Sequence, residues 1–234
     1  MAAAEREGLL LVNKPSGVTS HDVVQIVRRK LALRRIGHTG TLDPMAQGLL
    51  ILLVGRATRA QHAFQGHEKV YEATVRFGIQ TDTGDATGQP IRQADVPRWE
   101  HAYLAEVVAS FQGDMTQTPP AYSAVKVQGR PAYWWARRHQ PVALASRVIH
   151  LAEVTLLHDA AETATFRVRC SAGTYVRTLA ESIAERLGTV GHLTSLIRLR
   201  VGSWSLEDAK PLAWIEQASP GTLARELQSI APSA

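Results

Sequence analysis

Residues 37–44 have the composition of a loop that could carry a site: Gly-His-Thr-Gly-Thr-Leu-Asp-Pro, with no hydrophobic period. The two glycines permit left-handed backbone and the close approach of a ligand. Pro44 restricts Asp43 to extended conformations and so fixes where its carboxylate points. A carboxylate fixed in this way can act as a nucleophile or as a general base. On local grounds alone, however, the commoner meaning of an Asp-Pro pair is the start of a turn.

Several common chemistries have no motif in the sequence. There is no P-loop, no Gly-x-Gly-x-x-Gly, no Gly-x-Ser-x-Gly and no His-Glu-x-x-His. The nine histidines lack metal-like spacing with carboxylates or cysteine, so we predict no metal site. Cys170, the single cysteine, alternates with Arg167 and Arg169, which favours a packed small hydrophobe over a nucleophile.

The elements that hold the 37–44 loop follow from hydrophobic spacing. A short apolar strand at 8–12 ends in the turn residues 13–16. Thr19 or Ser20 can cap a helix whose apolar residues recur at helical spacing. After the loop, the apolar run 49–54 predicts a central strand that is buried on both faces.

Strands and helices then mix without strict βαβ alternation, which predicts an α+β protein. The expected elements are an alternating strand at 69–77, a long loop at 78–90, a helix after Pro97 that Gly113 ends, an extended surface arm at 117–127, a strand at 166–170, a helix opened by 173–177 and stopped by Gly188, and two short helix-like stretches after Ser205.

Basic residues indicate a polyanionic partner. The net charge is +5 and the pI is about 9.7. Five cations lie within eight residues: Arg28, Arg29, Lys30, Arg34 and Arg35. Together with the loop they favour nucleic acid. The alternative is a solvated helix end, where cations also suit the helix dipole.

The compartment is expected to be the cytoplasm. A single cysteine excludes an intrachain disulfide and suits a reducing environment. Residues 1–8 carry Glu5 and Glu7 and do not resemble a leader peptide. The longest apolar run, 49–54, is too short to cross a bilayer, so we expect no membrane association.

Several segments, in order, resemble the bacterial tRNA pseudouridine-55 synthases, the TruB family. The 37–44 loop is similar to the catalytic loop of that family. The other matching segments are 13–20 (Asn-Lys-Pro-Ser-Gly-Val-Thr-Ser), 69–72 (Lys-Val-Tyr-Glu), 81–85 (Thr-Asp-Thr-Gly-Asp), 117–126 (Gln-Thr-Pro-Pro-Ala-Tyr-Ser-Ala-Val-Lys) and 170–177 (Cys-Ser-Ala-Gly-Thr-Tyr-Val-Arg). The resemblance runs from about Gly8 to Trp204.

The resemblance implies a catalytic set. Asp43 matches the family's essential aspartate, which could attack C1′, remove a neighbouring proton or attack the uracil ring. Arg177 matches an arginine expected to pair with it and favour its ionised form. Tyr71 matches the tyrosine that stacks on the uracil and acts in C5 deprotonation. A surface arginine and a core aromatic are the ordinary alternatives for Arg177 and Tyr71.

The resemblance also implies binding residues. Asp85, Tyr175 and Leu196 match positions around the uracil pocket, although a turn aspartate and a core leucine are ordinary alternatives. His38 matches the histidine that contacts displaced bases. Phosphate contacts are expected from Lys14, Arg28, Arg29, Lys126 and Arg130.

The implied fold is the pseudouridine synthase fold, α+β with a large mixed, mainly antiparallel central sheet flanked by helices and loops. We expect a catalytic domain at 1–204, with an RNA-gripping arm at about 113–150. Residues 205–234 would form a short helical extension, too short for the PUA-type RNA-binding domain of many family members. The expected substrate is the T-arm of tRNA, with no cofactor, no obligatory protein partner and a monomeric state. Action on another RNA or through a guide complex, and a non-catalytic RNA-binding role, are the rival hypotheses.

Overall fold

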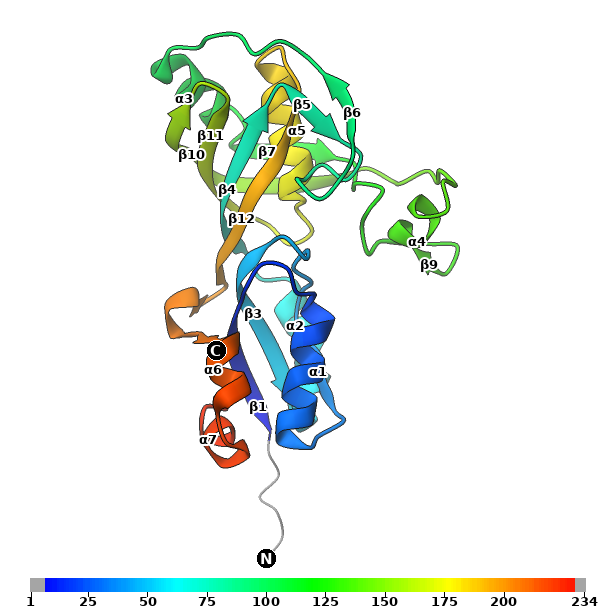
Figure 1. The fold of residues 1–234 in the computed structure, drawn as a ribbon, viewed down its shortest axis with the longest axis vertical. Coiled ribbons are helices and arrows are strands. Elements are labelled where there is room, and N and C mark those ends of the chain that lie inside the picture. Colours follow the sequence, from blue (N-terminus) through cyan, green and yellow to red (C-terminus); the bar gives the residue numbers. More distant parts are fainter. Residues whose placement is uncertain (1–6, 230–234) are drawn as a thin grey trace, which may run out of the picture. The chain divides into compact units, whose positions relative to one another are not determined.

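The structure is a computed structural model that describes residues 7–229. Residues 1–6, on which the expected lack of a leader partly depends, and 230–234, the end of the predicted extension, lie outside that range. The chain divides into two compact units, coloured by sequence in Figure 1. We call residues 1–69 with 197–234 the terminal unit and residues 70–196 the middle unit. The predicted domain limits at 204 and 205 remain a prediction.

The terminal unit is built on strands that pair in the order β14-β1-β3-β12, with β2 added to β3 and β13 to β12. The pairing of β1 with β3 is antiparallel, and that of β12 with β3 is parallel. Its elements are β1 (Gly8–Lys14), α1 (Ser20–Leu31), β2 (Ile36–His38), β3 (Gln47–Val54), a 3-10 helix (Gly55–Ala60), α2 (Gln61–Gln65), the end of β12 (Gly191–Val201), β13 (Trp204–Ser205), a second 3-10 helix (Leu206–Asp208), β14 (Lys210–Pro211), α6 (Leu212–Gln217) and α7 (Pro220–Arg225).

The predicted helix and central strand of this unit are confirmed. Thr19 caps α1 and forms a capping box with Asp22, which satisfies two backbone donors at the helix start. The helix buries its apolar stripe Val23, Val24, Val27 and Leu31. In β3, every residue after Gln47 is buried. At roughly 1.5–3 kcal/mol for each fully buried aliphatic side chain, this strand anchors the unit.

The middle unit has strands in the order β12-β4-β11-β10-β7. The pairs of β10 with β11 and with β7 are antiparallel, and α3 packs on β10 and α5. Its elements are β4 (Lys69–Phe77, from Val70), β5 (Ile79–Thr81), β6 (Pro90–Gln93), α3 (His101–Ala109), β7 (Gly113–Gln117), β8 (Lys126–Val127), β9 (Arg130–Pro131), α4 (Ala132–Ala136), β10 (Arg147–Ala160), β11 (Thr163–Cys170), α5 (Val176–Arg186) and the start of β12.

Some predicted boundaries in the middle unit were wrong. The expected loop at 78–90 begins and ends in the paired strands β5 and β6. The helix after Pro97 ends at Ala109 and not at Gly113, which opens β7. Because β7 and β10 belong to the sheet, the arm itself is residues 118–146. The alternating strand β4 is confirmed, with its apolar face buried.

The predicted fold class, α+β with mixed and mainly antiparallel strand pairing, is confirmed. Cys170 is buried at the end of β11, in agreement with a packing role. Across residues 7–229 no helix has the length and apolar character needed to span a membrane.

Candidate active site

Asp43 lies in a turn between β2 and β3, and its side chain is half-buried. The turn closes locally, since the amide of Ala46 donates to the carbonyl of Asp43 at 3.0 Å. The segment 13–20 is bonded to the same turn, because the amide of Gly17 donates to the carbonyl of Pro44 at 2.9 Å. Two motifs that are well separated in the sequence therefore form one structure.

Ser20 fixes the residue before Asp43. Its hydroxyl donates to the carbonyl of Leu42 at 3.0 Å and accepts from the Leu42 amide at 2.8 Å. Because Thr19 provides the helix cap, the Ser20 hydroxyl is available for this pair of bonds. The sequence suggested only a capping role for Ser20, so this contact was missed.

Lys14 differs from its predicted role as a phosphate contact. The residue is 0% exposed, and Nζ donates to the carbonyls of Pro15 at 2.9 Å, Val18 at 2.8 Å and Pro44 at 3.3 Å. An ammonium group has three donors, and all three are used by backbone oxygens. The prediction was wrong because it took a cation in a motif to be a surface cation.

Burial lowers the pKa of Lys14 to about 8, while the carboxylates of Asp43 and Asp22 raise it and Arg198 lowers it further. The ammonium group and the Asp43 carboxylate therefore attract each other inside the terminal unit. Lys14 both bonds the Asp43 turn and supplies positive charge near it.

Arg198, on β12, is a second buried cation at this loop and was not predicted. It is 2% exposed; its Nε donates to the carbonyl of Leu49 at 2.8 Å and its Nη2 to that of Gly40 at 3.1 Å. β12 lies close to β3 at Gly48, which has a φ of 100° and where a Cβ would come within 2.4 Å of the Arg198 carbonyl. Only glycine fits there.

His38, expected to contact displaced bases, ends β2 just before the loop. Burial lowers its pKa, and the charges of Arg198 and His21 lower it further. The ring is therefore neutral at pH 7. Its Nδ1 is buried and has no hydrogen-bond partner among residues 7–229.

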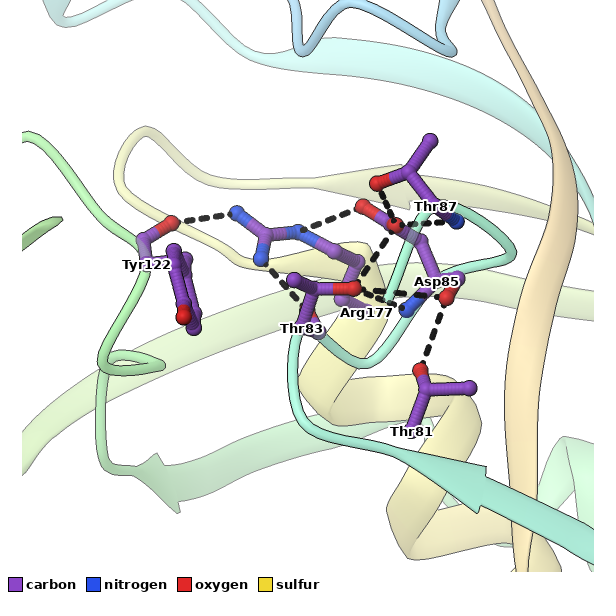
Figure 2. Close-up of polar contacts among 6 residues, drawn as sticks. All are labelled: Thr81, Thr83, Asp85, Thr87, Tyr122 and Arg177. Atoms are coloured by element: carbon purple, nitrogen blue, oxygen red, sulfur yellow. Dashed lines mark hydrogen bonds and ion pairs between the residues drawn. The ribbon is translucent and has the colours of Figure 1, made fainter. Parts of the chain in front are cut away.

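The middle unit holds a second polar network around Arg177, in the first turn of α5 (Figure 2). Arg177 donates to the carbonyls of Thr83 at 2.7 Å and Tyr122 at 2.8 Å, and its Nε lies 4.0 Å from Oδ2 of Asp85. The arm, which contains Tyr122, and the 81–88 loop are thus both bonded to α5.

Asp85 is held by its own loop. Its Oδ1 accepts from the Thr83 hydroxyl at 2.8 Å and from the Thr87 amide and hydroxyl at 2.9 and 2.5 Å. Thr81 donates to the Asp85 carbonyl at 2.7 Å. Figure 2 shows these bonds converging on the aspartate. Asp85 therefore stabilises its own turn, which is the ordinary role that the sequence also allowed for it.

Tyr175 is fixed by residues at both roots of the arm. Gln117, which is buried, accepts from the Tyr175 amide at 2.8 Å and donates to its carbonyl at 3.0 Å. Arg147 lies over the Tyr175 ring, 5.1 Å from its centroid, and bonds the carbonyl of Gly173. Sequence reasoning missed Gln117 and Arg147.

The remaining candidates are distributed between strands and the arm. Tyr71 on β4 is 9% exposed and Leu196 on β12 is buried, so both also satisfy their core alternatives. Lys126 and Arg130 are exposed on the arm. Arg130 and Arg138 lie over the Trp134 ring, 5.4 and 3.7 Å from its centroid.

The predicted residues thus fall into two groups. The terminal unit holds Asp43, His38, Lys14, Arg28 and Arg29, whereas the middle unit holds Tyr71, Asp85, Lys126, Arg130, Tyr175, Arg177 and Leu196. The expected pairing of Arg177 with Asp43 remains a prediction. Within residues 7–229 no three His, Cys, Asp or Glu side chains form a group that could hold a metal ion.

The sequence profile of the TruB family pseudouridylate synthase (N terminal domain) matches residues 28–176, which is more than half of the chain. This chain belongs to the TruB family of pseudouridylate synthases. The match contains the Asp43 loop, Tyr71, Asp85 and the whole arm.

Relatives extend the TruB likeness over nearly the whole chain. The tRNA pseudouridine synthase B of Hydrogenovibrio crunogenus is 44% identical over 90% of this chain and 69% of its own length. That of Opitutus terrae is 45% identical over 91% of this chain and 88% of its own length. A solved Cbf5-Nop10-Gar1 complex contains a chain with a TM-score of 0.71 and 28% identity, covering 95% of this chain. This chain spans 60% of that longer one.

Proposed function

We propose that this protein isomerises a uridine in the T-loop of tRNA, position 55, to pseudouridine, with Asp43 as the catalytic carboxylate and without a cofactor. The observation that carries the proposal is the construction of the 37–44 loop in a TruB chain. Ser20, Lys14 and Arg198 bond the loop through its backbone. Each of these bonds ends on a backbone carbonyl of the loop, so together they fix the backbone from which the Asp43 side chain projects.

The reaction is a balanced rearrangement. The bond from N1 of uracil to C1′ breaks, the base turns, C5 bonds to C1′, the proton leaves C5 and N1 gains one. A single carboxylate suffices because uracil leaves as a delocalised anion that is recaptured, whereas a glycosidase must protonate an alkoxide. Asp43 can attack C1′, remove the C2′ proton or add to the uracil ring, and these alternatives remain open.

The resemblance supplies further roles within the proposal. Tyr71 stacks on the uracil and acts in removal of the C5 proton, and Arg177 orients the Asp43 carboxylate. Tyr175, Leu196 and Asp85 surround the base. The bonds of Arg177 to Thr83 and Tyr122 support an ordered guanidinium.

The target uridine must leave the stack of the folded T-loop, at a cost of a few kcal/mol. His38 is suited to the vacated space because its ring is neutral, and Lys126 and Arg130 on the arm would contact phosphates. We further propose that the protein works in the cytoplasm as a monomer without a guide RNA or protein partner.

The test is release of tritium from transcribed tRNA labelled at C5 of uridine. Wild type should release one equivalent of tritium for each tRNA molecule, and Asp43→Asn should release it at least about 10³-fold more slowly. Urea denaturation of both proteins checks that the variant is folded. A transcript with the T-loop uridine replaced by cytidine should give no release.

Each result has a clear meaning. No release by purified wild type would defeat the proposal of a stand-alone enzyme. Equal release by Asp43→Asn would defeat the assignment of Asp43. Release from the cytidine transcript would place the modified uridine elsewhere.

A further inference from the structure

A groove of about 410 Å³ lies at the C-terminal end of α1 in the terminal unit. It is lined by Gln25, Arg28, Arg29, Ala32, Leu33 and Arg34. Residues 28–35 contain five cations and no acidic residue. We call Arg28, Arg29 and Arg34 the arginine groove.

The positive charge of the arginine groove is not neutralised by the protein. Within residues 7–229, no carboxylate lies within 4.0 Å of these three guanidinium groups. The two neighbouring cations have neutral partners within the protein: Lys30 donates to the carbonyl of Ala218, and Arg35 donates to the hydroxyl of Thr58. Three like charges that face one groove repel each other, and a bound anion would remove that repulsion.

Arg28 is held by one hydrogen bond to the backbone. Its Nη2 donates to the carbonyl of Ile36 at 2.7 Å, and its Nε is buried without a partner in the described part of the chain. Arg29 and Arg34 are exposed beside it.

Completion of the helix end does not account for the three arginines. The C-cap residue Ala32, in the left-handed conformation, already donates its amide to the carbonyls of Arg28 and Arg29. The helix C-terminus carries about half a negative charge. Three guanidinium charges exceed that amount, so the groove attracts anions.

The position along α1 relates the groove to the reaction. Ser20, at the other end of the helix, is bonded to Leu42 beside Asp43. Twelve residues of helix are about 18 Å long. An anion in the groove would therefore lie several nucleotides from a uridine at Asp43.

We propose that the arginine groove binds backbone phosphate of the substrate RNA outside the T-loop uridine. This inference rests on the proposed function, since RNA is the polyanion concerned. Guanidinium forks match phosphate oxygens in pairs. The contact contributes affinity and salt dependence, whereas turnover of bound RNA does not depend on it.

The experiment compares two double variants that remove the same charge. The test variant is Arg29→Gln with Arg34→Gln, which keeps the Arg28 bond to Ile36. At Arg29, the one of the two positions that lies in α1, glutamine matches arginine in helix propensity. The control is Arg59→Gln with Arg92→Gln, at two exposed arginines that do not line the groove. For each protein, tRNA Kd is measured from about 50 to 200 mM salt, and single-turnover tritium release is measured at saturating tRNA.

The test variant should bind tRNA about tenfold more weakly, with a salt slope reduced by about two, while its rate at saturation stays within about twofold of wild type. The control should bind within about twofold of wild type. Equal weakening in both variants, or wild-type affinity in the test variant, overturns the proposal. If the groove binds inorganic phosphate but the test variant keeps the wild-type affinity for tRNA, the proposal is overturned as well. Failure of the proposed function would instead appear as no tritium release by wild type, and Kd would still report on the groove.

Discussion

The 37–44 loop in the terminal unit is held through its backbone, whereas the 81–88 loop in the middle unit is held by its own side chains. Lys14 and Arg198 are buried cations whose donors bond carbonyl oxygens of or beside the first loop. In the second loop, the Asp85 carboxylate accepts from Thr83 and Thr87 and faces a buried arginine.

The two loops therefore differ in the chemical groups that hold them. In the first loop, the bonds from Ser20, Lys14 and Arg198 go to backbone groups of residues 40–44. In the second loop the carboxylate itself is the centre of the structure. Asp85 is thus suited to order Arg177, and chemical change at Asp85 would disturb its own loop.

The largest expected effect is at the buried cation of the first loop. Arg198→Met leaves the carbonyls of Leu49 and Gly40 without their donors in a buried site, and should lower the free energy of unfolding by about 3 kcal/mol in urea denaturation. Arg200→Met, at an exposed arginine on the same strand, should stay within about 0.5 kcal/mol of wild type. A similar small loss for both variants would mean that the backbone bonds do not hold the loop.

Lys14→Met should lower the free energy of unfolding by about 2 kcal/mol near neutral pH, because three carbonyls lose a donor. The cost should also depend on pH. In the folded protein Lys14 releases its proton near pH 8, whereas in the unfolded chain it releases the proton near its ordinary pKa of 10.5. Since the unfolded state binds more protons between these values, wild-type stability rises there relative to the variant.

Urea denaturation at about pH 7 and about pH 9.5 measures the stability gap, which is the difference in free energy of unfolding between wild type and Lys14→Met. The control is Lys126→Met, at an exposed lysine. The gap should widen at the higher pH for Lys14 only. A gap that narrows or stays constant would contradict a buried ammonium group whose pKa is lowered by burial.

A smaller effect is expected at Asp85, where Asp85→Asn keeps an oxygen for Thr83 and Thr87 but loses the charge that faces Arg177. The free energy of unfolding should fall by about 1 kcal/mol, and Asp85→Ala, which also removes the acceptor, should lose about twice as much. If the two variants are equally stable, the hydrogen bonds from the threonines do not hold the 81–88 loop.

By itself the sequence determined the local elements. The cap at Thr19, the buried run 49–54 and the alternation of β4 were predictable, since each depends on residues close in the chain. The Asp43 loop was identified through its resemblance to the TruB family, because its own residues favoured an ordinary turn. By contrast β10 was missed: register shifts after Leu151 and Leu156 interrupt its alternation.

Only the tertiary structure decided what the cations do. Lys14 and Arg198 look like surface residues in the sequence, because a charged side chain is normally buried only with a partner. Their partners are backbone carbonyls, which every residue possesses and no sequence pattern marks. Those carbonyls, at Pro44, Gly40 and Leu49, come within reach only when β1, β3 and β12 pair. Side-chain type can therefore be read along the chain, but the acceptors of a buried cation are set by the packing of distant segments.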